Sequence, residues 1–102
     1  MYKFLNLKSA NDGKHKYQIT LEHIPTGKQH TVKFGGHGYD DFTLSRNTKK
    51  REDYILRHKV REDWNDPLKP GTLSRYILWN KPTLLLSLQD YLKRFNISSK
   101  WG

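Results

Sequence analysis

The sequence predicts a small α+β domain, in which a three-stranded antiparallel β-meander packs against three C-terminal helices. Three observations support this prediction: strand-like alternation up to residue 34, helix-like spacing from residue 48 onward, and turn signals between these segments. The chain has 102 residues and contains no internal repeat or long linker. We therefore expect one domain that spans residues 1–102.

The first third of the chain has the features of three strands. Residues 15–24 alternate between apolar and polar side chains, and residues 29–34 repeat the alternation. Pro25 and Gly27 lie between them and favour a tight turn, because proline presets φ and glycine accepts a positive φ. Upstream, residues 2–8 form a less regular strand, which an Asp-Gly turn signal separates from the hairpin.

The spacing of apolar residues next predicts a helix over 48–64. Leu56, Val60 and Trp64 recur at intervals of four residues, which would place them on one buried face. Prolines and a glycine then break the chain.

Two further helices are expected after that break. The first spans residues 72–80, and the second begins after Thr83, a suitable N-cap. Lys93 and Arg94 in the last turn suit the helix dipole. The side chains expected to be buried on the last helix are Leu84, Leu88, Leu92 and Phe95.

The charge favours anionic partners, because the formal net charge is +9. Residues 1–34 hold six Lys and two acidic residues, and residues 67–102 hold six basic residues and one acidic residue, so the excess lies at both ends.

No apolar run is long enough for a membrane span or a signal peptide, so we expect a soluble, unsecreted protein. The absence of cysteine excludes disulfides and thiolate chemistry.

A stripe on the first predicted helix is the strongest indication of nucleic-acid binding. Lys50, Arg57 and Arg61 could neutralise phosphates, and Tyr54 could stack on a base. Acidic residues share this helix, so a solvated, salt-bridged face is the alternative. Further candidates for anionic contacts lie near the two ends of the chain: Lys14, Lys16, Lys28, Lys33, Lys93, Arg94 and Lys100. None belongs to a base-reading motif, so binding to DNA would be nonspecific.

The glycine-rich stretch from residue 35 to 41 also raises the question of catalysis. His37, Asp40 and Asp41 are close in sequence, and together with His58 they could form a nuclease-like site. The alternative is that an aspartate caps a turn and that His58 packs against the sheet. The spacing matches no metal or phosphate-loop signature, so we predict no catalytic residue, metal or cofactor. The stretch then forms a strand-to-helix corner.

Two aromatic residues near this corner and one near the end of the chain have expected roles. Tyr39 and Phe42 are expected to pack beneath the corner. Trp101 lies in a short tail with little of the domain left to bury it, and tryptophan is enriched in binding hot spots. We expect Trp101 to contribute to a protein interface.

Four fragments resemble a family of small basic proteins that nucleocytoplasmic large DNA viruses encode. The fragments are VKFGGHGYDDFT, REDYILRHKVREDW, GTLSRYILWNKPTL and LKRF, in that order between about residues 28 and 95. The features that carry the resemblance are residues 32–35, Gly38 with Tyr39, Arg57 and His58 with Trp64, and residues 79–82. The resemblance implies a viral origin and a virion or infected-cell setting, and it implies no particular reaction.

The leading functional expectation is a non-enzymatic minor structural protein of a large DNA virus particle. It would dock on acidic viral structural proteins through basic edges and exposed aromatic residues. The first alternative is a nonspecific DNA-binding protein that packages or protects the genome. The second alternative is a nuclease-like enzyme. We expect no small-molecule substrate.

Overall fold

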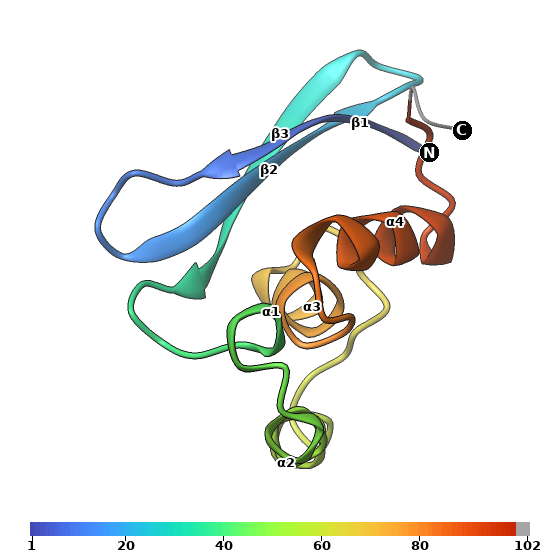
Figure 1. Ribbon diagram of the computed structural model, residues 1–102. Coiled ribbons are helices and arrows are strands. Elements are labelled where there is room, and N and C mark those ends of the chain that lie inside the picture. Colours follow the sequence, from blue (N-terminus) through green and yellow to red (C-terminus); the bar gives the residue numbers. More distant parts are fainter. Residues whose placement is uncertain (100–102) are drawn as a thin grey trace.

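The computed structural model describes residues 1–99 and has the predicted α+β architecture (Figure 1). The sheet contains β1 (Tyr2–Ser9), β2 (His15–His23) and β3 (Lys28–Gly36) in the order β1-β2-β3. Both neighbouring pairs are antiparallel, so the strands form the predicted meander.

The register of the hairpin places its apolar residues on one face. Ile19 pairs with Val32 and Tyr17 pairs with Phe34, as the alternation predicts. Gly27 has a φ of 71° in the turn between β2 and β3, which confirms the positive φ expected there.

A β-bulge explains why the first strand is less regular in sequence. The pairing of β1 with β2 shifts between Phe4 and Asn6, so Leu5 is an extra residue. Phe4 pairs with Leu21 and Leu7 pairs with Ile19, so side chains three residues apart in β1 point to the same face of the sheet. Strict alternation would have placed one of them on the other face.

The helical half contains four α-helices and one π-helical turn among the described residues. These elements are α1 (Phe42–Ser45), α2 (Thr48–His58), α3 (Pro70–Leu73), η1 (Ser74–Leu78) and α4 (Leu84–Arg94). The predicted second helix corresponds to α3 and η1, which follow one another without a break. The predicted cap Thr83 is confirmed, because its side chain accepts a hydrogen bond from Leu86 N at 3.2 Å.

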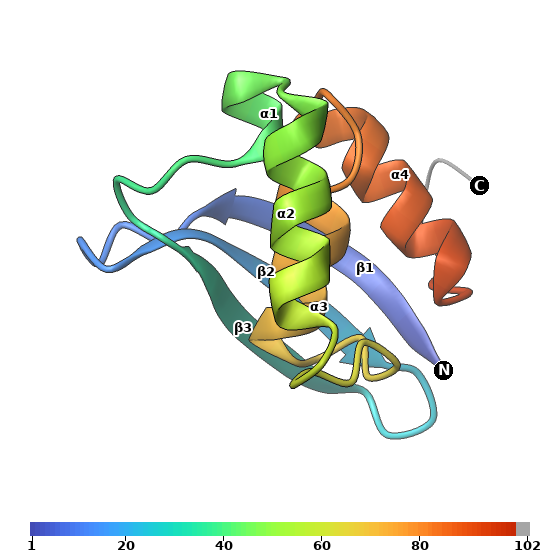
Figure 2. The ribbon, with the colours of Figure 1, turned by 90° about the horizontal axis from the view of Figure 1, so that it is seen from below.

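Helix α2 differs from the prediction in length and orientation. It ends at His58 rather than at residue 64. Leu56 and Val60, which were expected to be buried, are 58% and 75% exposed, so this prediction was wrong. In Figures 1 and 2, α3 and α4 cover the sheet, and α2 lies across α3 on the side away from the sheet.

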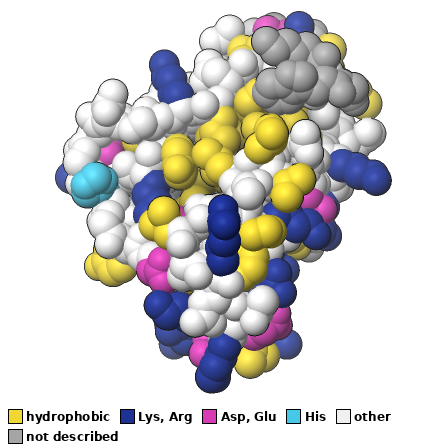
Figure 3. All heavy atoms as spheres, viewed as in Figure 1, with side chains coloured by type: hydrophobic (Ala, Val, Ile, Leu, Met, Phe, Trp, Pro, Cys, Tyr) yellow, Lys and Arg dark blue, Asp and Glu magenta, His cyan; other side chains and the backbone are white. Residues whose placement is uncertain are grey.

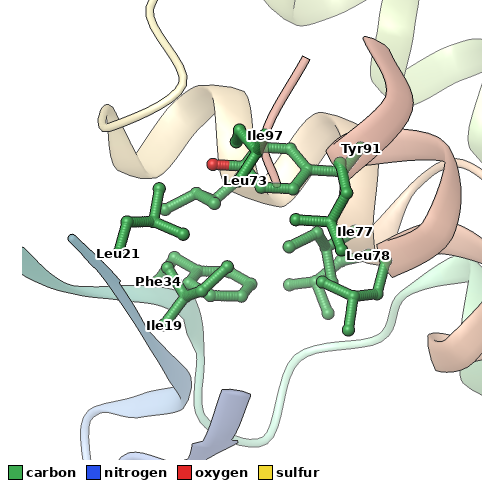
Figure 4. Packing of buried hydrophobic residues seen from close by; sticks show 10 residues of the cluster. Ile19, Leu21, Phe34, Leu73, Ile77, Leu78, Tyr91 and Ile97 are labelled. Atoms are coloured by element: carbon green, nitrogen blue, oxygen red, sulfur yellow. The ribbon is translucent and has the colours of Figure 1, made fainter. Parts of the chain in front are cut away.

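The core lies between the sheet and the helices that cover it (Figure 4). Ile19, Leu21 and Phe34 from the sheet are fully buried against Leu73 and Ile77. Of the four side chains predicted to be buried on the last helix, Leu88 and Leu92 are buried, and Leu84 and Phe95 are partly buried. Tyr91 on α4 is also buried, which the prediction missed.

The segment after α4 returns to the first strand. Ser98 forms a parallel bridge with Lys3, in which Ser98 N donates to Tyr2 O at 3.0 Å and Phe4 N donates to Ser98 O at 2.7 Å. The edge of β1 is therefore paired at this point.

Within residues 1–99, no helix has the length and apolar character needed to cross a membrane.

Candidate nucleic-acid interface in the hollow beside α2

A hollow of about 500 Å³ lies between the loop after β3, helix α2 and the π-helical turn, and we call it the α2 hollow. Its size is within the usual range of ligand sites, roughly 300–1,000 Å³. The lining residues are Lys16, Gly35, Gly36, Tyr39, Asp40, Lys50, Asp53, Tyr54, Arg57, His58, Ser74, Leu78 and Trp79. The glycine-rich stretch thus meets three of the four residues of the basic stripe, Lys50, Tyr54 and Arg57, in one place.

The glycines of the loop allow the chain to turn closely past the helices. Gly35 has a φ of 78°, and a Cβ there would lie 2.7 Å from Leu78 Cδ1. Only glycine combines that conformation with so close an approach. The predicted strand-to-helix corner is confirmed. Phe42 is buried as expected, but Tyr39 is 75% exposed, so the prediction that it packs beneath the corner was wrong.

The two adjacent aspartates have different environments. Asp41 is buried, caps α1 by accepting a hydrogen bond from Thr43 N at 2.8 Å, and forms an ion pair with Lys16. Asp40 lies at the rim, where Lys50 Nζ is 2.9 Å from its Oδ2. The hydrogen bond from Lys50 lowers the pKa of Asp40 from its usual value.

Three rings stack along one wall of the hollow. Tyr54 lies between His58, at a centroid distance of 4.1 Å, and Trp79, at 4.8 Å. Trp79 directly follows η1, and its backbone N–H donates to Ser74 O, five residues earlier, in a π-helical hydrogen bond. Burial, followed by the charge of Glu62, raises the pKa of Tyr54 to about 12. The Tyr54 hydroxyl of this wall therefore stays protonated at physiological pH.

The alternative that His58 packs against the sheet is wrong. His58 stacks on Tyr54, and its Nδ1 is 2.7 Å from Glu62 Oε2. The carboxylate orients the imidazole, as the spacing of four residues between them allows.

The basic stripe is divided between two hollows. Lys50, Tyr54 and Arg57 line the α2 hollow, whereas Arg61 lines a second hollow of about 260 Å³ beside Gly71. The Arg57 guanidinium forms no hydrogen bond or ion pair with any of residues 1–99. It is a cation that can accept an anionic ligand without giving up a partner.

The other predicted basic residues do not form one surface with the hollow. Lys16 joins it but is only 12% exposed, while Lys33 is 3.5 Å from Asp12 and Arg94 is 3.3 Å from Asp90. Figure 3 shows Lys and Arg side chains scattered around the visible face, with acidic side chains among them. Lys14, Lys28 and Lys93 are exposed but do not line the hollow, and Lys100 and Trp101 lie outside the described residues.

The residues of the possible nuclease site are only partly brought together. Asp40 and His58 both line the α2 hollow, but His37 does not, and the buried Asp41 is engaged with Lys16 and the α1 cap. Within residues 1–99, no three His, Cys, Asp or Glu side chains are grouped to hold a metal ion.

Sequence reasoning missed the stacking of Tyr54 between His58 and Trp79, and it did not place Asp53 in a site. The spacing of Tyr54 and His58 is a local signal that could have predicted their stacking. The approach of Trp79 depends on the tertiary fold, because it lies 25 residues beyond Tyr54. Asp53 is one of the acidic residues that favoured a solvated, salt-bridged face for this helix, yet it lines the hollow together with Asp40.

In a comparison with protein families, the chain matches a family of unknown function, DUF5754, over residues 5–58. This match covers just over half of the 102 residues. The chain belongs to the DUF5754 family. The matched region includes the meander from residue 5 onward, the glycine-rich loop and α2, and therefore most of the α2 hollow. No curated protein matches the chain, and no solved structure matches it.

Proposed function

We propose that this DUF5754 protein is a non-enzymatic protein that binds DNA nonspecifically through the α2 hollow. The observation that carries the proposal is that Lys50 and Arg57 line one hollow with a wall of stacked rings. Cations that neutralise phosphates, placed beside aromatic rings, are the elements of nonspecific nucleic-acid binding. The resemblance to proteins of large DNA viruses suggests genome packaging or protection as the setting.

Lys50 and Arg57 can contact a phosphate more readily than Lys16 can. Arg57 has no anionic partner among residues 1–99, and Lys50 pairs with Asp40 on the surface. An exposed ion pair contributes little, so Lys50 can exchange Asp40 for a phosphate. Lys16 is largely buried against Asp41 and keeps a structural role.

A salt titration with matched variants tests this proposal. The affinity for a mixed-sequence DNA is measured across sodium chloride concentrations for the wild type and for the double variant Lys50→Gln/Arg57→Gln. We expect weaker binding and a log–log salt slope that is smaller by about 1.8 for duplex DNA or about 1.4 for a single strand. The control is Lys28→Gln/Lys93→Gln, which removes the same charge at positions outside the hollow.

Equal losses of affinity in the two double variants would show that net charge, and not the hollow, attracts the DNA.

Incubation of the protein with supercoiled DNA and Mg²⁺ or Mn²⁺ separates binding from nuclease activity, and we expect the DNA to stay intact. Cleavage that disappears in Asp40→Asn or His58→Ala would replace the binding proposal with the enzymatic one.

Docking on acidic structural proteins of a virus particle is the second candidate function. It is favoured by Leu56 and Val60, which lie exposed near one end of α2, the helix farthest from the sheet. The test is incorporation into purified particles, measured by quantitative mass spectrometry. Docking predicts that Leu56→Ser/Val60→Ser reduces incorporation, an effect that DNA binding through the α2 hollow does not predict.

A further inference from the structure

The α2 hollow contains an exposed ring that phosphate binding alone does not require. Tyr39 is 75% exposed, although it lies close against the backbone: a Cβ on Gly36 would be 2.5 Å from Tyr39 Cδ2. The absence of a side chain at Gly36 therefore gives the Tyr39 ring its place at the rim. An exposed ring held at the rim of a hollow is a platform on which a planar group can stack.

The charges of the hollow are mixed, which is a second feature that phosphate binding does not explain. Asp40 and Asp53 line the hollow together with Lys50 and Arg57. A carboxylate repels a phosphate, but it accepts hydrogen bonds from the exocyclic amino groups of bases. The lining thus suits a whole nucleotide, whose phosphate and base meet different partners.

The shape of the site distinguishes between single and double strands. A duplex keeps its bases stacked and paired, and it presents its backbone to a concave surface. An unpaired nucleotide can place its base inside a hollow of about 500 Å³. We propose that the α2 hollow holds an unpaired nucleotide of single-stranded DNA, with the base stacked on Tyr39 and the phosphate between Lys50 and Arg57. This inference rests on the proposed function and specifies its ligand.

An abasic oligonucleotide tests the inference, because it keeps the phosphates and lacks the bases. The wild type should bind a short single strand roughly 5- to 150-fold more tightly than its abasic counterpart. Tyr39→Ala should lower the affinity for the normal strand to the abasic level and leave the abasic affinity unchanged. Tyr39→Phe, which keeps the ring, should retain the preference.

Two further variants control for indirect effects. Gly36→Ala leaves Tyr39 in the chain but displaces its ring, so it should weaken the preference for the normal strand. Leu44→Ala removes an exposed apolar side chain outside the hollow and should change nothing. A duplex of the same sequence should compete more weakly than the single strand.

The outcomes separate this inference from the proposed function. Equal binding of normal and abasic strands, with a steep salt dependence that Lys50→Gln/Arg57→Gln reduces, would overturn the base platform and support DNA binding through phosphates alone. Failure to bind any DNA at low salt would overturn both. Displacement of the strand by a free mononucleotide at equal concentration would overturn the strand as ligand and assign the hollow to free nucleotides.

Discussion

At the scale of single residues, Asp40 and Asp41 show how burial divides two identical side chains between different roles. The sequence places them side by side and suggests that one of them caps a turn. Which one does so depends on Lys16, which approaches from β2, 25 residues earlier. That approach follows from the tertiary fold, so local sequence patterns could not resolve it.

Replacement of the two aspartates should therefore have unequal effects on stability. Asp41→Ala should lower the free energy of unfolding by about 3 to 5 kcal/mol, because it leaves Lys16 buried without its partner. The same change also removes the N-cap of α1. Asp40→Ala removes only a rim contact and should cost much less. Urea denaturation measures both, and equal losses would contradict the structural role assigned to Asp41.

At the scale of elements, the strands were predictable and α2 was only partly so. Alternation and turn residues are local, and the meander follows from them. Helix α2 carries apolar side chains on more than one face, so spacing alone favoured Leu56 and Val60. The structure instead packs Tyr54 inward, because His58 and Trp79 enclose its ring on both sides. One of the two enclosing rings, Trp79, comes from a segment that is distant in the sequence.

Substitutions on α2 can verify this orientation. Leu56→Ser should change the free energy of unfolding by less than about 0.5 kcal/mol, as is usual for surface positions. Tyr54→Ala should destabilise the fold by about 3 kcal/mol or more, because it empties a packed aromatic position. Thermal or urea unfolding of both variants distinguishes the two faces. If Leu56→Ser lowered the free energy of unfolding more than Tyr54→Ala, the face with Leu56 and Val60 would be the buried one, as the spacing predicted.

At the scale of the whole molecule, the fold class was predictable and the layering was not. The sequence indicates a sheet followed by helices, but it does not indicate that α2 lies beyond α3 and α4. The α2 hollow arises from that layering, since it is bounded by the loop after β3, by α2 and by η1. The members of the basic stripe could be proposed from spacing alone. Tyr39 and Trp79 required the assembled molecule.

The stability of the whole molecule should decline at alkaline pH. Burial raises the pKa of Tyr54 from 10 to about 12, and it also raises the pKa of Tyr91, whose hydroxyl donates to Pro67 O at 2.7 Å. Both are protonated in the folded state when the unfolded chain begins to lose these protons. Stability is therefore fully present below about pH 10 and is lost as the pH rises toward 12.

Urea denaturation at several pH values between 9 and 12 measures this decline. Tyr54→Phe should show a shallower decline than the wild type, because one of the two hydroxyls with a raised pKa is gone. Tyr39→Phe, in which the changed ring is exposed, is the matched control and should follow the wild type. A Tyr54→Phe variant as sensitive as the wild type would show that this hydroxyl does not couple folding to pH.

The parallel bridge between Ser98 and β1 has a mechanical consequence. The chain at Ser98 runs parallel to β1. The two backbone hydrogen bonds of Ser98 join the beginning of the sheet to the segment after α4. Tension applied to the two flanking segments would load both bonds at once in shear. They would therefore break together, and the meander and the helices would separate only after that. Pulled at both ends, the molecule would resist stretching until these two hydrogen bonds break.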